Sequence, residues 1–240
     1  MAGLALDVFI EGETLDLCAP SDDPAVVDRW FRWFNRRKVT EYLPQGMFPN
    51  TASEQTQYVQ SAASRDRLLV LLKPKGAQHV IGVASLSGIN HVQRQCDIAM
   101  VVGEQVASAD ALFFALETKA RLTEHAFEVM GMERINSSQV AELVRWQRWQ
   151  ILFGYQIEGV LRQKFRKGQT AHDVFVSSCL VADYLAVKKA RGGRFWPGKA
   201  VMFDLLKQLP ETSLIDELNE WLSRRHAEYW QGVTFSLEAS

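Results

Sequence analysis

Apolar residues recur along most of this chain with either the alternation of a strand or the spacing of a helix. The central pattern predicts an apolar strand over 96–102, a turn at Gly103, and a helix from about Ser108 to Met130. One stripe of that helix repeats every three or four positions, at Ala111, Ala115, Thr118, Leu122, Ala126 and Val129. This spacing indicates a helix that packs one face on a sheet. A helix N-terminus that follows a strand end also suits a phosphate or another anion.

The remaining pattern predicts an alternation of further strands and helices around this centre. Strands are expected over 4–10, 68–72, 79–87, 133–138, 155–161 and 171–181. Helices are expected over about 21–35, 51–64, 199–208 and 213–230. A further helix, rich in Trp and Arg, is expected to end at about residue 153. The turn at 73–76 indicates a hairpin, and three neighbouring antiparallel strands are expected there. Two Pro and a Gly predict a loop over 41–51, and 191–198 has the composition of a linker.

Composition and charge narrow the classes of function. The chain has 240 residues, 47% hydrophobic and 23% charged, with a formal net charge of -1. These values are ordinary for a globular protein and give no electrostatic reason to expect a nucleic-acid partner. Cys18, Cys96 and Cys179 are far apart, which favours buried free thiols over a metal site or a disulfide. No apolar run is long enough to cross a membrane, and Asp7 interrupts the first one, so we expect a cytoplasmic protein.

The helix that ends near residue 153 combines two Trp with two Arg. Arg145 and Arg148 share one helix face, and Trp146 and Trp149 share the neighbouring one. Such a set could stack bases and contact phosphates. The interpretation that we favour is a core stripe beside a solvated basic face.

Several segments resemble the GNAT acyltransferase superfamily, and within it the branch that acetylates ribosomal proteins, polyamines and amino sugars. The most specific are 125–135 and 153–162, the latter followed by Lys167-Gly168 and 172–174, while 37–43 and 80–86 match more weakly. The resemblance covers roughly residues 5 to 182. It implies an α+β fold with a mixed, mostly antiparallel sheet flanked by helices. We accordingly expect a GNAT-like domain over 1–184 and a C-terminal helical extension over 185–240.

The chain departs from the family where the phosphates of the donor are expected. The phosphate-loop window falls on 110–115, where only Ala115 agrees, and Glu104 and Asp110 add negative charge. A shifted loop with small side chains could serve instead, at Ala107, Ser108 and Ala109. The family's Asn and its proton-donating Tyr on the next helix fall on Leu143 and Gln150.

The resemblance also assigns candidate site residues. Asp97 stands where many relatives carry a Glu that acts as a base through water, and a general base must lie within hydrogen-bond reach of its proton. His91, in the turn before this strand, could serve instead. Both residues could also be ordinary surface groups. Backbone N–H groups near Met100, Val101 and Val102 are expected to hold the donor and polarise its carbonyl. Tyr42 and Gln45 are expected to line the acceptor pocket, with simple loop packing as their alternative. No metal site is expected.

The resulting hypothesis is an N-acyltransferase that moves an acetyl group from acetyl-CoA to a primary amine of a small molecule such as an amino sugar. One alternative is a GNAT-fold protein that has lost this activity and serves as a binding or scaffold module. Another is an acyltransferase whose donor is bound to a carrier protein. The two C-terminal helices suggest a homo-oligomer or a protein partner.

Overall fold

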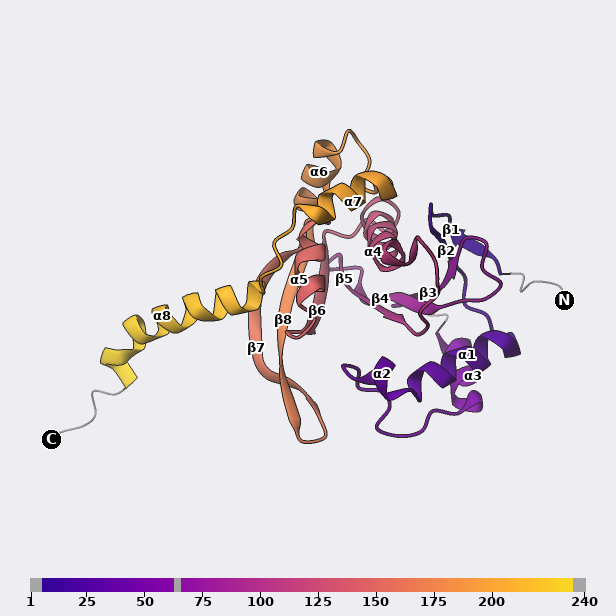
Figure 1. The fold of residues 1–240 in the computed structure, drawn as a ribbon, viewed down its shortest axis with the longest axis horizontal. Coiled ribbons are helices and arrows are strands. Elements are labelled where there is room, and N and C mark those ends of the chain that lie inside the picture. The colour runs from indigo at the N-terminus through magenta and orange to yellow at the C-terminus, as the bar shows by residue number, and fades with distance from the viewer. Residues whose placement is uncertain (1–5, 63–65, 235–240) are drawn as a thin grey trace.

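An eight-stranded sheet forms the centre of the molecule, in the strand order β1-β2-β3-β4-β5-β6-β8-β7 (Figure 1). The computed structural model describes residues 6–62 and 66–234. The strands are β1 (Val8–Ile10), β2 (Leu15–Cys18), β3 (Leu68–Pro74), β4 (Gly82–Asn90), β5 (Gln95–Val102), β6 (Arg134–Val140), β7 (Gln156–Lys167) and β8 (Thr170–Leu180). All neighbouring strands are antiparallel except β5 and β6, which are parallel. The predicted α+β class and the antiparallel set β3-β4-β5 are therefore confirmed.

The first strand is shorter than predicted, and a second one was missed. Of the strand expected over 4–10, residues 4 and 5 lie outside the described residues, and β1 begins at Val8. The four residues of β2 show little alternation, but they pair with both β1 and β3. Pairing between distant segments therefore creates a strand that its own pattern does not announce.

Helices cover both faces of the sheet and extend beyond it. They are α1 (Pro24–Phe34), α2 (Arg37–Thr40), α3 (Ala52–Ser61), α4 (Ala111–Glu128), α5 (Val144–Ile151), α6 (Val181–Ala190), α7 (Lys199–Lys207) and α8 (Leu214–Thr234). One apolar core lies between the sheet and α4, and a second, around Trp30 and Trp33, lies between the sheet and α1 and α3. Figure 1 shows α4 with α6 and α7 on one side and α1 to α3 on the other.

Helix α4 is held against the sheet by its central turns. Leu122 and Ala126 are fully buried, as the stripe predicted, but Val129 is 70% exposed because the helix ends at Glu128. The buried carboxylate of Glu117 accepts hydrogen bonds from the backbone N–H of Glu13, at 2.6 Å, and of Thr14, at 2.7 Å. These contacts tie α4 to the turn between β1 and β2 and so set the position of the helix across the sheet.

The segment expected to be a linker joins the main core instead. Helix α6 was not predicted, and it contains residue 184, after which a domain boundary was expected. Phe195 and Met202 are completely buried, and Trp196 is almost so, within the core that also holds α4. Aromatic residues between two glycine-containing turns therefore anchor α7 to the body of the protein.

Among the residues of α8 whose side chains are described, 214–225, the contacts with the rest of the chain lie at the beginning of the helix. Ile215 is buried, and the guanidinium of Arg148 on α5 contacts Thr212, at 2.7 Å, and Glu217, at 2.9 Å. The helix then runs away from the body (Figure 1), and Trp221 is 51% exposed. Over residues 214–225, the apolar face of α8 is thus only partly buried. Arg148 is buried rather than solvated, which corrects the interpretation of a basic surface on α5.

Candidate active site

The parallel strands β5 and β6 pair over a short stretch and then separate. Their ladder joins Gln95 to Arg134, Cys96 to Ile135 and Asp97 to Asn136, and it extends no further. Beyond it, β5 continues to Val102 beside β4, while β6 continues to Val140 beside β8. The edge of β5 after Asp97 is therefore left with backbone N–H and C=O groups that have no strand partner on that side.

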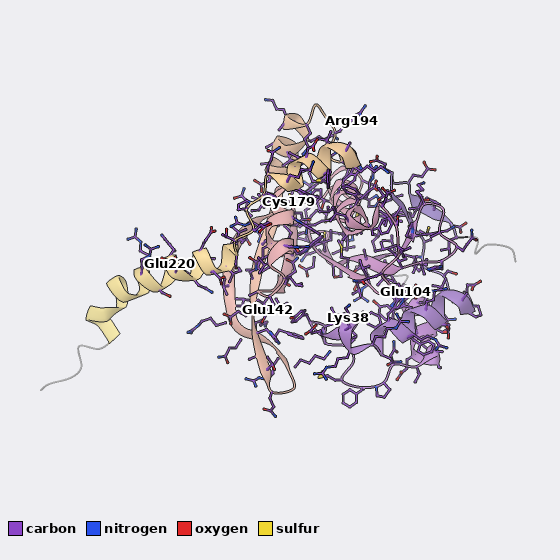
Figure 2. All side chains as sticks on the ribbon, in the orientation of Figure 1. Lys38, Glu104, Glu142, Cys179, Arg194 and Glu220 are labelled. Atoms are coloured by element: carbon purple, nitrogen blue, oxygen red, sulfur yellow. The ribbon has the colours of Figure 1, made fainter. Side chains whose placement is uncertain are left out.

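A cavity of about 920 Å³ opens at this separation. Its walls come from α2 and the turn after it, from β5 and β6, and from α4 and α5. Lys38, on α2, lines the cavity. Figure 2 labels Lys38 on one side of the space between α2 and the β7–β8 hairpin, and Glu142, just after β6, on the other. This volume lies within the range of about 300–1,000 Å³ that is usual for small-molecule sites.

Asp97 lies at the start of the separation and faces the cavity. Its neighbours Cys96 and Ile98 are buried in the core under α4, so the alternation of the strand turns Asp97 to the opposite face. Gly88 on β4 leaves room for it, because a Cβ there would lie 3.1 Å from the carboxylate. The carboxylate makes no ion pair within the described residues. Asp97 thus places a carboxylate in the cavity wall with no direct ion-pair partner among the described residues.

His91 is not brought to the same place. It lies exposed in the turn between β4 and β5 and is not among the residues that line the cavity. The turn precedes the paired end of β5, whereas the cavity opens from Asp97 onward. The two candidate bases therefore lie apart, and only Asp97 faces the open space.

Tyr42 and Gln45 belong to two adjoining cavities. Tyr42 lines the large cavity and touches the ring of His172 edge-on, at 5.5 Å between ring centroids. Gln45 lines a second cavity of about 600 Å³, whose walls also include Trp30 and Tyr58. Met100 and Val101 line both cavities, and Val102 lines the large one. The two spaces therefore meet at β5.

The loop before α4 is exposed and lies outside the large cavity. The hydroxyl of Ser108 accepts from the N–H of Asp110, and its carbonyl accepts from Ala111, both at 3.1 Å. Within the described chain, the N–H groups of Ala107 and Ala109 have no hydrogen-bond partner. This small-residue loop therefore keeps backbone donors available beside the N-terminus of α4.

The negative charges near this loop are both paired. Glu104 contacts Arg29, at 3.0 Å, and His79, at 3.5 Å. Asp110 contacts Lys199 of α7, at 2.8 Å. The repulsion of an anion that the sequence suggested is therefore reduced by partners from distant segments.

A buried lysine on the cavity wall escaped the sequence analysis. Lys119 follows Ala115 by one helical turn, both residues line the cavity, and Lys119 is only 1% exposed. Burial lowers the pKa of its ammonium to about 7. The stripe of α4 could have revealed it, because a position four residues after Ala115 must face the sheet. Gln150, at the position of the family's Tyr, is also buried and accepts a hydrogen bond from Lys119 at 2.9 Å.

Comparison with protein families identifies the fold of this site. The model of the acetyltransferase (GNAT) domain matches residues 17–148, more than half of the chain. The chain belongs to the GNAT acetyltransferase family. A comparison with curated proteins gave no match. The matched region contains the separation of β5 and β6, Asp97 and Lys119.

Solved structures support the same fold. A GCN5-related N-acetyltransferase from Brucella melitensis is 20% identical over 83% of this chain and 89% of its own, with a TM-score of 0.63. Spermidine N-acetyltransferase from Vibrio cholerae, solved with CoA and spermine, is 18% identical over 72% of this chain and 99% of its own, with a TM-score of 0.62. The microcin C7 self-immunity acetyltransferase MccE, solved with acetyl-CoA and AMP, is 15% identical over 71% of this chain and 94% of its own, with a TM-score of 0.59.

The described residues include neither a metal-binding cluster nor a membrane-spanning helix. No group of three or more His, Cys, Asp or Glu side chains there could hold a metal ion. In the same part of the chain, no helix combines the length and apolar character needed to cross a membrane.

Proposed function

We propose that this member of the GNAT family transfers an acetyl group from acetyl-CoA to a primary amine of a small molecule, such as an amino sugar. The observation that carries the proposal is the separation of β5 from β6 at Asp97, which opens a cavity of about 920 Å³ beside an unpaired strand edge. A thioester arm can lie along this edge and bond to its free backbone groups.

The donor would be held by the backbone of two neighbouring segments. Met100, Val101 and Val102 supply the strand edge, whose N–H groups polarise the acyl carbonyl and stabilise the oxyanion that forms on it. The pyrophosphate would bind at Ala107, Ser108 and Ala109, beside the N-terminus of α4. The open N–H groups of Ala107 and Ala109 and the pairing of Asp110 with Lys199 support this assignment.

Asp97 would prepare the acceptor. An amine arrives at neutral pH mainly as an ammonium, and its attraction to this carboxylate brings it to the cavity wall. Asp97, directly or through a water molecule, removes one proton and leaves a lone pair on nitrogen. The nitrogen attacks the thioester carbon and loses its second proton through the same carboxylate, and the C–S bond then breaks with its electron pair going to sulphur, which takes up a proton to give free CoA thiol.

The lining of the adjoining cavity supports a small cationic acceptor near Gln45, because Glu54 is the charged side chain among its described lining residues. The large cavity carries both signs of charge, with Glu41, Asp97 and Glu158 beside Lys38, Lys119 and Arg134. The structure of the Vibrio cholerae enzyme holds spermine, a small amine. An amino sugar remains our proposal on the resemblance of the sequence alone.

Calorimetric titration with acetyl-CoA, followed by an acetylation screen of polyamines and amino sugars, tests the proposal. Micromolar binding and acetylation of at least one amine are expected. Asp97→Asn should then lower kcat by about 10²-fold or more, while Asp204→Asn on α7, which is exposed and paired with Lys207, serves as the control. Absence of binding at millimolar acetyl-CoA would contradict the proposed mechanism.

The alternatives gain no support from the site. The degenerate phosphate loop and the extra C-terminal helices suggest an inactive scaffold, but the loop keeps open N–H groups at Ala107 and Ala109, and the nearby Glu104 and Asp110 are both paired. A carrier-bound donor has no specific observation in its favour. A partner or second copy on the C-terminal helices stays a prediction, which the mass of the protein in sedimentation would check.

A further inference from the structure

Four polar side chains behind the large cavity form a closed ring of hydrogen bonds. The ammonium of Lys119 donates to Gln150, at 2.9 Å, and to the hydroxyl of Ser137, at 3.3 Å. The amide nitrogen of Gln150 donates to the oxygen of Gln139, at 2.5 Å, and the amide nitrogen of Gln139 donates to Ser137, at 2.8 Å. The ring thus joins α4, β6 and α5.

Protonated Lys119 sets the direction of every bond in this ring. An ammonium donates and cannot accept, so the oxygen of Gln150 must face it and the amide nitrogen must face Gln139. The same rule turns the nitrogen of Gln139 toward Ser137. The hydroxyl of Ser137 then receives two hydrogen bonds, which occupy both of its lone pairs.

The proton of Ser137 is therefore left to point out of the ring. Its O–H has no acceptor within the described residues, although the side chain is only 4% exposed and lines the cavity. A buried hydroxyl without an acceptor is unfavourable unless a ligand supplies one. The geometry thus directs one O–H donor into the space where a ligand binds.

Lys119 brings an uncompensated positive charge to this donor. No carboxylate forms an ion pair with it within the described part of the chain, and its ammonium lies 3.6 Å from the centre of the Tyr155 ring and 5.8 Å from that of Trp146. Cys179, on β8, has its pKa raised to about 12 by burial, and burial raises the pKa of Tyr155 well above its usual value. The titratable neighbours are therefore neutral, and a negative charge that forms in the cavity would stabilise the ammonium.

Ser137 is also placed at the point where chemistry would occur. It follows Asn136, which forms the last pair of the β5–β6 ladder with Asp97. The alternation of β5 puts Asp97 on the face opposite α4, while Lys119 approaches from the α4 side. A thioester on the edge of β5 would thus lie between a base and a proton donor.

We propose that Ser137 donates its proton to the sulphur of the departing thiolate and that Lys119 replaces this proton on Ser137. The inference rests on the proposed acyl transfer. When the C–S bond breaks, its electron pair goes to sulphur, which takes the hydroxyl proton to give free CoA thiol. The oxygen of Ser137 takes a proton from Lys119, which becomes a neutral amine and is reprotonated from solvent. The acceptor nitrogen, which arrives as an ammonium, loses one proton before the attack and a second from the tetrahedral intermediate, both through Asp97. One of these protons balances the one that CoA gains, and the other passes to solvent.

A test without an acceptor uses the complex with CoA alone. The pKa of the bound thiol is followed by the ultraviolet absorbance of the thiolate as the pH is raised. In the wild type it should lie below that of free CoA, because the ring stabilises the thiolate, and Lys119→Met should bring it back toward the free value. Lys189→Met, an exposed lysine on α6, is the matched control and should leave it unchanged.

Turnover of an acetylated amine gives the second test. Ser137→Ala should lower kcat by about 10²-fold, and Ser137→Thr, which keeps the hydroxyl, should restore most of it. Exposed Ser53→Ala on α3 is the control. The wild-type rate should fall on the alkaline side as Lys119 loses its proton, and this fall should disappear in Lys119→Met.

The outcomes separate the two proposals. If CoA does not bind to the wild type, the acyl-transfer function fails and this inference fails with it. If CoA binds and amines are acetylated, but the thiol pKa and the alkaline limb are the same in wild type, Lys119→Met and Ser137→Ala, the inference alone is overturned. A lower thiol pKa in the wild type, lost in Lys119→Met, supports it.

Discussion

The ammonium of Lys167 lies 2.8 Å from the backbone oxygen of Gln45, which precedes it by 122 residues. It also donates to the backbone oxygen of Leu43, at 3.1 Å, and to that of Thr40. One lysine at the end of β7 therefore holds the loop that carries Tyr42 and Gln45, the two residues expected to line the acceptor pocket. The β7–β8 hairpin thereby fixes one wall of the site.

Lys167→Met should release this loop. We expect KM for the amine to rise several-fold while the affinity for acetyl-CoA stays unchanged, because the donor contacts β5 and the start of α4 instead. The loss of stability should be below about 1 kcal/mol, since Lys167 is partly solvated. Hydrogen exchange of residues 41–50 should become faster. Lys164→Met, exposed on the same strand, is the control, and equal exchange in both variants would show that Lys167 does not hold the loop.

Lys199→Gln should weaken the binding of acetyl-CoA. The substitution leaves Asp110 uncompensated beside the proposed pyrophosphate site, so Kd should rise several-fold, and more at low salt than at high salt. The double variant Asp110→Asn with Lys199→Gln should recover the wild-type value, because it removes both charges. Titration calorimetry measures all three proteins. Lys207→Gln on the same helix should have no effect, and a double variant as weak as the single one would contradict the charge argument.

The stability of Lys119→Met relative to the wild type should depend on pH. The pKa of Lys119 is lowered by burial from 10.5 to about 7, so the unfolded chain binds more protons than the folded one between these values. Burial of the protonated Lys119 therefore lowers the free energy of unfolding by its full amount below about pH 7. This loss becomes smaller as the pH rises and disappears near the pKa of the unfolded chain. The free energy of unfolding of Lys119→Met should exceed that of the wild type most at low pH, by on the order of a few kcal/mol.

Urea unfolding at several pH values measures this difference. The free energy of unfolding of the wild type should approach that of the variant between neutral and alkaline pH. The free energy of unfolding of Lys189→Met, which replaces an exposed side chain, should follow the same pH dependence as that of the wild type. A constant offset between Lys119→Met and the wild type would show that Lys119 titrates normally in the folded protein.

Truncation should separate the two parts of the C-terminal extension. A chain ending after residue 193 loses Phe195, Trp196 and Met202 from the core, and its midpoint of thermal unfolding should fall markedly. A chain ending after residue 217 keeps these residues, Ile215 and the contacts of Arg148, and it should unfold near the wild-type temperature. Equal stability of the two truncated chains would favour a boundary after residue 184.

Much of the fold follows from local patterns. The alternation in β5 and the spacing in α4 predict their buried faces, because periods of two and of 3.6 residues decide which side chains share a side. The family resemblance, rather than these periods, led to Asp97 and to the loop 107–109. They failed for β2 and α6, and for the buried Phe195 and Trp196, where distant packing partners outweigh local composition.

The sequence by itself determined most of the strands and helices and their order, the family resemblance, and the residue types present around the site. Only the tertiary structure decided that β5 and β6 separate after Asp97, that Lys199 neutralises Asp110, and that Lys119 meets Gln150 across 31 residues of chain. The physical reason is that backbone periodicity acts over neighbouring residues, whereas ion pairs, ladder ends and buried hydrogen bonds depend on segments that folding alone brings together.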